Sequence, residues 1–175
     1  PAERPVMSEW AEAFEAAAAM QVRCDHHERC CGGSFYWNRA RQCPFCEQVA
    51  PVDHQVLFRH FVVAAKEDLP EGAKPGDRLI ESGWRQVLNV GRGELRIAPP
   101  GSAEHARAEP FLGLSLAGQK LSLIPSGNLP LTLEWRGDRL TQPLRARQEL
   151  PRSGKKYRLH VGDCSATHDA WHFEW

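Results

Sequence analysis

The stretch VGRGELRIAPPGSAEHARAEPFLGLSLAGQKLSLIPSGNLPLTLEWRG, residues 90–137, decides the fold of this chain. Apolar runs of strand length alternate in it with short polar clusters, and the runs are Leu95–Ile97, Leu112–Leu116 and Leu121–Ile124. Short apolar runs bounded by Gly, Pro, Ser and Asn are typical of strands joined by turns. The stretch therefore predicts a succession of short β-strands.

The polar clusters between these runs carry side chains that can bind an anion. They are Gly91-Arg92, Ser102–Arg107 and Ser126-Gly127-Asn128. Arginine presents a planar fork of donors, serine a hydroxyl and asparagine an amide, and a phosphate accepts hydrogen bonds from all three. We therefore predict an anion site built from loops at the tips of strands.

The order of these clusters resembles that of the forkhead-associated (FHA) domain, a β-sandwich that binds phosphothreonine peptides. The likeness consists of Gly91-Arg92, Ser102-x-x-His105 and the turn at Asn128 that leads to Trp135-Arg136-Gly137. The later segments Leu150–Lys155, Tyr157–Gly162 and Trp171–Trp175 resemble the closing part of that domain.

The resemblance implies a phosphate site and a structural brace, His105. The residues that it places around the phosphate are Arg92, Ser102, Arg107 and Asn128. Two departures from the family pattern favour an alternative, a sandwich that docks a partner protein without phosphate. Gly93 stands where the family has a serine, and Leu129 stands where it has a glycine.

Five of the six cysteines cluster upstream of this region, at Cys24, Cys30, Cys31, Cys43 and Cys46. Cys43-Pro44-Phe45-Cys46 is a C-x-x-C knuckle, which points two thiolates at one metal ion. Cys24 is a candidate third ligand. The fourth is Cys30 or Cys31, with His26 and His27 also in reach; the glycines after Cys31 suit a second tight knuckle.

Two other interpretations of these cysteines fit less well than structural zinc. A disulfide framework leaves an odd thiol in the cluster. A redox C-x-x-C normally opens a helix, whereas Cys46 is followed by Glu-Gln-Val-Ala-Pro. We therefore predict a zinc ribbon over residues 24–50, with a strand at Ser34–Asn38.

An amphipathic helix is predicted from Ser8 to Met20. The segment is rich in alanine, the best helix former, and it places Trp10, Phe14 and Ala17 near one face. Just before it, Arg4-Pro5-x-x-x-Glu9-Trp10 resembles the end of a protein-kinase domain.

Together with C-P-F-C, this segment resembles bacterial serine/threonine kinases of tellurite-resistance and related conflict operons. In those proteins a zinc ribbon with a C-P-W-C knuckle follows the kinase fold, and Phe45 here replaces the tryptophan. Because the chain begins at Pro1 without a methionine, we expect a fragment of a longer kinase-like protein. It would retain only the last kinase helix, without the catalytic loop or magnesium ligands.

The charges of the chain balance, with 22 Lys and Arg against 22 Asp and Glu, so no overall field attracts nucleic acid. A local excess lies between Arg136 and His160, where eight basic residues accompany two acidic ones. We expect a solvated sheet edge there; a nucleic-acid-binding face is a further alternative.

The sequence contains no recognisable enzymatic motif. A phosphate-binding loop with Lys-Ser/Thr, His-Glu-x-x-His and Gly-x-Ser-x-Gly are all absent from it, and Cys164 is expected to be a structural thiol. The isolated histidines are expected to be packed or solvated rather than to form a second metal site; they are His54, His60, His160, His168 and His172. No apolar run approaches the ~20 residues of a membrane span, and with no signal peptide we expect a cytoplasmic location.

The sequence thus predicts a mainly β protein in three parts. These are a helix within residues 1–23, a zinc ribbon over 24–50 and an FHA-like antiparallel β-sandwich over 51–175. The expected function is a non-catalytic adaptor that binds a phosphorylated segment of a partner protein or of a kinase.

Overall fold

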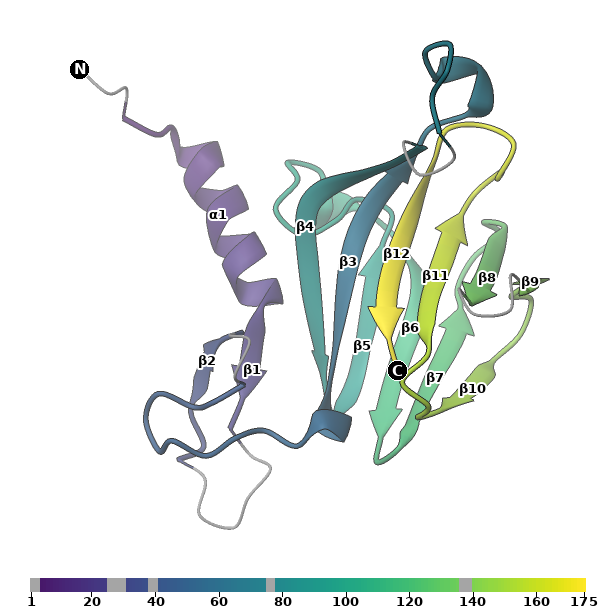
Figure 1. Ribbon diagram of the computed structural model, residues 1–175. Helices are drawn as coiled ribbons and strands as arrows, with labels where there is room; N and C mark the ends of the chain where they lie inside the picture. The colour runs from purple at the N-terminus through teal and green to yellow at the C-terminus, as the bar shows by residue number, and fades with distance from the viewer. Residues whose placement is uncertain (1–3, 25–30, 38–40, 75–77, 136–139) are drawn as a thin grey trace.

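The computed structural model describes residues 4–24, 31–37, 41–74, 78–135 and 140–175. The fold is mainly β, with a single α-helix at the N-terminal end of the described chain (Figure 1). All strand pairs in its three sheets are antiparallel. The predicted fold class, mainly β with an N-terminal helix, is confirmed.

Helix α1 spans Met7–Ala19, close to the predicted range. The Glu9 carboxylate accepts a hydrogen bond from the Val6 backbone N–H at 2.8 Å, which satisfies one of the unpaired donors at the helix start. Trp10 and Phe14 lie on one face of the helix, where they stack on each other and remain 49% and 67% exposed. Among the described helices, none is long and apolar enough to cross a membrane.

A two-stranded sheet follows the helix and precedes the sandwich. It pairs β1, Gln21–Arg23, with β2, Ser34–Tyr36, and the facing Val22 and Phe35 are both buried. A single bridge between Gln42 and Val49 continues this unit. We call β1, β2 and the described residues up to Ala50 the ribbon; it begins at β1, before the predicted boundary at Cys24.

Two larger sheets form a β-sandwich from the rest of the chain. The six-stranded sheet has the order β4-β3-β12-β11-β8-β9 and the four-stranded sheet the order β10-β7-β6-β5. The first sheet consists of β3 Gln55–Val63, β4 Leu79–Asn89, β8 Leu131–Trp135, β9 Leu140–Pro143, β11 Lys156–Val161 and β12 His168–Glu174. The second consists of β5 Gly91–Arg96, β6 Pro110–Ala117, β7 Lys120–Pro125 and β10 Gln148–Pro151.

The main hydrophobic core lies between these two sheets. Side chains alternate in direction along a strand, so every second residue of a strand points into the core. Phe58 and Trp171 come from the six-stranded sheet, and Leu112, Leu114 and Leu121 from the four-stranded one. The apolar runs of the opening stretch thus supply most of one side of the core, and Leu150 of β10 adds to it.

A second, smaller core joins the ribbon to the outer face of the six-stranded sheet. Val87 of β4 and Leu57 of β3 face each other across the strand pair and contact this core. The ribbon contributes buried side chains from several segments to it: Met20, Val22, Cys24, Phe35 and Cys43. The cysteines are therefore part of the packing that holds the ribbon on the sandwich.

Candidate metal centre

Four cysteines of the ribbon bring their sulfur atoms together. They are Cys24, Cys31, Cys43 and Cys46, and their Sγ atoms all lie within 4.8 Å of one another. The closest pairs, Cys24 with Cys46 and Cys31 with Cys43, are 3.5 Å apart. All four are free thiols. We call this cluster the four-cysteine centre.

Two backbone turns aim these thiols at one point. In the first, the Glu47 N–H donates to the Cys43 carbonyl at 2.8 Å, and Glu47 adopts a positive φ of 58°. In the second, Gly32 has a φ of 66°, a left-handed conformation that glycine adopts without strain. A Cβ atom on Gly33 would lie 3.3 Å from the Cys31 sulfur, so the second turn also needs a small residue there.

The surroundings of the sulfur atoms set their protonation. Burial raises the pKa of the Cys24 thiol to about 12. Burial acts in the same direction on Cys43, but the backbone N–H groups of Phe45 and Cys46 donate to its sulfur and lower its pKa to about 7. Such donors favour the thiolate, which is the metal-binding form. Cys43 is therefore the ligand most readily deprotonated at neutral pH.

The geometry suits a tetrahedral metal ion. Metal–sulfur bonds of about 2.3 Å place the sulfur atoms of a tetrahedral site about 3.8 Å apart. This separation lies between the 3.5 Å of the two sulfur pairs and the 4.8 Å within which all four sulfur atoms lie. Four thiolates also fill the coordination sphere and leave no open position, which is the arrangement of a structural site.

The structure brings together Cys24, Cys43 and Cys46 and selects Cys31 as the fourth member. The alternatives Cys30, His26 and His27 lie outside the described residues. The glycines that follow Cys31 were the sequence signal that could distinguish it from its neighbour.

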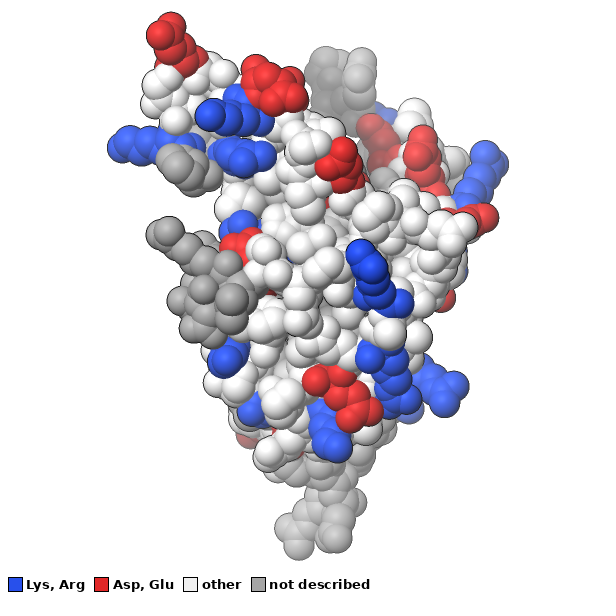
Figure 2. Space-filling view, turned by 90° about the vertical axis from the view of Figure 1, so that its right-hand side faces the viewer, with Lys and Arg blue, Asp and Glu red and all other residues white. Residues whose placement is uncertain are grey.

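The predicted basic stretch does not form a continuous cationic surface in the part that the structure describes. Acidic side chains form ion pairs with some of its basic residues. Arg147 binds Glu149, two residues away, at 2.8 Å, and Arg158 binds Glu134 of the paired strand β8 at 3.0 Å. Figure 2 shows the side of the molecule at the right of Figure 1, where basic and acidic side chains are interspersed. This pattern favours a solvated edge over a nucleic-acid-binding face.

The four predicted phosphate-site residues lie at two ends of the four-stranded sheet. Arg92 is near the start of β5 and pairs with Ser115 of β6. Ser102 and Arg107 follow the other end of β5, and Asn128 follows β7 at that same end. The strand rise separates Arg92 from the end of β5 at Arg96 by about 13 Å. The structure therefore brings three of these residues to one end and leaves Arg92 at the other.

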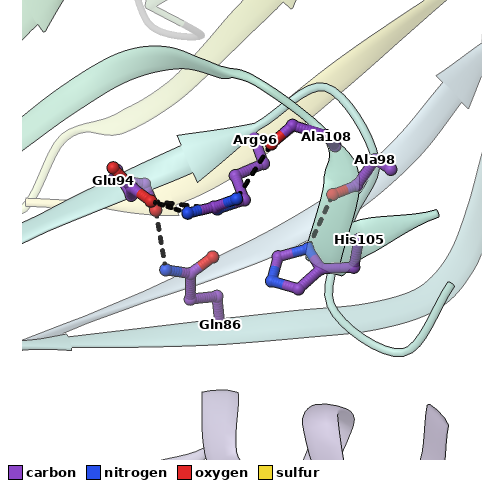
Figure 3. A network of polar contacts seen from close by, with 6 residues as sticks. All are labelled: Gln86, Glu94, Arg96, Ala98, His105 and Ala108. Atoms are coloured by element: carbon purple, nitrogen blue, oxygen red, sulfur yellow. Dashed lines mark hydrogen bonds and ion pairs between the residues drawn. The ribbon is translucent and has the colours of Figure 1, made fainter.

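Hydrogen bonds fix the loop that carries Ser102 and His105. The His105 Nδ1–H donates to the Ala98 carbonyl at 2.8 Å, which agrees with a bracing role, and Arg96 donates to the Ala108 carbonyl at 2.9 Å (Figure 3). The Ser102 hydroxyl donates to the Pro99 carbonyl at 2.8 Å, so its proton is already engaged within the loop.

A groove that no local sequence pattern indicated lies between the ribbon and the outer face of the six-stranded sheet. This cavity of about 760 Å³ is lined by five basic side chains, Arg41, Arg59, Arg85, Arg152 and Lys156, and by two acidic ones, Glu81 and Glu174. We call it the cationic groove. Its basic residues come from four separate segments of the chain, so no local charge run revealed it.

Two arginines of the cationic groove influence each other directly. Burial lowers the pKa of the Arg41 guanidinium, and the positive charge of Arg152 lowers it further. Arg152 is held with its guanidinium 5.0 Å from the centre of the Trp175 ring. An anion bound in the groove would therefore reduce the repulsion between the Arg41 and Arg152 guanidinium groups.

Comparisons with known proteins leave the family of this chain open: no protein-family model, curated protein or solved structure matches it significantly.

Proposed function

We propose that this chain is a non-catalytic adaptor that binds a phosphorylated segment of a partner protein in the cationic groove. The observation that carries this proposal is the excess of five basic over two acidic side chains around one cavity of a chain whose net charge is zero. A phosphorylated side chain brings a charge of about −1.5 to −2 at neutral pH and three acceptor oxygens. Arginine forks bind such oxygens in pairs.

The chemistry of the groove favours a peptide as the carrier of the phosphate. Aromatic side chains of the ribbon, Tyr36 and Trp37, line the groove beside the arginines and offer apolar contacts to a peptide chain. The likeness of Arg4–Trp10 to the end of a kinase domain supports a phosphorylated partner. The interspersed charges on the face shown in Figure 2 argue against an extended nucleic-acid backbone as a ligand of that face.

In this proposal the four-cysteine centre holds Zn²⁺, whose role is structural. Zinc is the expected ion because four thiolates in a closed tetrahedral site are a common zinc donor set. The ion would fix the ribbon that supplies Arg41 to the groove, and the sandwich would supply the other four basic side chains. The metal would thus support binding without contacting the ligand.

The test is titration of the chain with a degenerate phosphothreonine peptide library, with the unphosphorylated library as control. A charge-assisted hydrogen bond contributes about 1.5–3 kcal/mol, so Arg41→Gln should weaken phosphopeptide binding at least tenfold. Arg92→Gln is the matched control, because Arg92 is exposed at the start of β5 and does not line the groove. Its affinity should equal that of the wild type.

If phosphopeptide binding is lost in Arg92→Gln and kept in Arg41→Gln, the cationic groove is not the binding site, and the FHA-like loops are favoured instead. Binding to both libraries alike would favour the second candidate, docking without phosphate, which the exposed Trp10 and Phe14 of α1 support. Binding to oligonucleotides with a steep dependence on salt would instead identify a nucleic-acid-binding protein.

A further inference from the structure

Two buried histidines face each other on the outer side of the six-stranded sheet, far from the four-cysteine centre in the chain. His160 lies on β11 and His168 begins β12, and each is only 8% exposed. The Nδ1 atom of His160 is 2.8 Å from the Nε2 atom of His168. Cys164 lies in the loop between these strands, and the three ligand atoms are all within 4.8 Å of one another.

The outward nitrogens of both rings have partners that can only accept a hydrogen bond. The Nε2 of His160 is 3.0 Å from a carboxylate oxygen of Glu134, and the Nδ1 of His168 is 2.8 Å from the Ala166 carbonyl. Each outward nitrogen must therefore carry the proton. In neutral imidazoles this leaves two lone pairs pointing at each other across 2.8 Å, and only a cation between them makes that contact favourable.

That cation is either a proton, which fits the 2.8 Å separation directly, or a metal ion, whose bonds of about 2.0–2.1 Å in a tetrahedral site require the two nitrogens to move about 0.5 Å apart. The sulfur of Cys164 adds a third, soft donor to the two nitrogens. Two imidazoles and a thiolate are ligands that Zn²⁺ and related transition metals prefer. We propose that His160, His168 and Cys164 form a second metal site that binds one transition-metal ion of the Zn²⁺ class.

Hydrogen bonds orient the two histidines and the loop of Cys164 without a bound ion. Metal-binding histidines usually donate their other N–H to a carboxylate or a carbonyl, which fixes the ring, and both histidines here do so. Glu134 is itself held by Arg158 at 3.0 Å. In the loop, the backbone N–H and hydroxyl of Ser165 donate to the Asp163 carboxylate at 2.9 and 2.8 Å, which shapes the turn beside Cys164.

Three protein ligands leave a tetrahedral ion one open position. The three residues line a cavity of about 470 Å³, together with Arg78, Thr132 and Thr141. The fourth position is therefore open to water or a small anion, unlike the closed four-cysteine centre. The sequence concealed this site because His160 and His168 are separated by a turn, and only the register of the hairpin brings their rings together.

The test counts the metal ions that the full chain holds. After equilibration with micromolar free Zn²⁺ and gel filtration, elemental analysis should find about two ions per wild-type chain, one for each site. Titration with Co²⁺ of the chain that already holds one Zn²⁺ should add one ion, with a thiolate-to-cobalt charge-transfer band. A wild-type chain that stays at one ion while its four-cysteine centre is occupied would overturn the proposal.

Cys164→Ser is the decisive variant, because Cys164 is exposed and its replacement leaves the core intact. It should bind the second ion at least tenfold more weakly and lose the charge-transfer band that this ion contributes. His168→Gln should reduce the count to about one ion per chain, provided that its melting temperature shows a folded protein. His105→Gln, in the loop after β5 and outside the cluster, should keep both ions. Unchanged second-ion affinity and an unchanged band in Cys164→Ser would refute the assignment of these ligands.

Discussion

At the scale of single residues, Cys43 gives the four-cysteine centre a thiol that titrates near neutral pH. Its pKa of about 7 lies below the ordinary value of 9.0, since backbone N–H groups offset the effect of burial. The stabilisation that comes from a lowered pKa is fully present above the ordinary pKa of the thiol. It is lost as the pH falls through about 7. Cys24 behaves oppositely: burial keeps its proton on until a metal ion displaces it.

We therefore predict that the affinity of the chain for Zn²⁺ rises with pH up to the range in which Cys24 ionises, and that it falls more steeply below about pH 7, where protons compete for Cys43 as well. Competition with a chromophoric chelator of known pH dependence measures this profile. Cys43→Ser should weaken binding at every pH and remove the inflection near pH 7. A wild-type profile without an inflection between about pH 6 and 8 would contradict the role given to Cys43.

At the scale of elements, we expect the ribbon to depend on a metal ion in the four-cysteine centre more than the sandwich does. β1 and β2 pair over only three residues each, and a two-stranded sheet of this size is marginal in water. We predict that a chelator removes the hydrogen-exchange protection of Val22 and Phe35 while the β11–β12 pair keeps most of its protection. Re-addition of Zn²⁺ should restore it. Equal loss of protection in both places would show that the ribbon and the sandwich unfold together.

The sequence predicted the elements better than it predicted the surfaces between them. The knuckle at Cys43 and the apolar runs of β6 and β7 are local patterns, and local geometry makes their signals visible. The cationic groove and the His160–His168 contact are not local, because strand pairing assembles them from distant segments. The periodicity of α1 located the helix but not its contact with the sandwich, which the helix approaches through Ala16, beside Gly101.

At the scale of the whole molecule, the β3–β4 pair belongs to two cores at once. Neighbouring residues of β4 point to opposite sides, so Val87 packs in the ribbon core and Leu88 in the sandwich core. One side of the pair thus holds the four-cysteine centre and the other the interior of the sandwich. The cationic groove depends on both, because its lining includes ribbon and sandwich residues.

Substitution of these two neighbours should separate the contributions of the two cores. Leu88→Ala should destabilise the whole chain by about 2–5 kcal/mol, the usual effect of a cavity in a close-packed core. Val87→Ala removes less buried volume and should loosen the ribbon selectively, which weakens both Zn²⁺ and phosphopeptide binding while the sandwich retains its melting temperature. Calorimetry, chelator competition and peptide titration on the two variants measure these effects. If Val87→Ala weakens Zn²⁺ binding but not peptide binding, the ribbon is not part of the binding surface, and the groove would have to be formed by the sandwich alone.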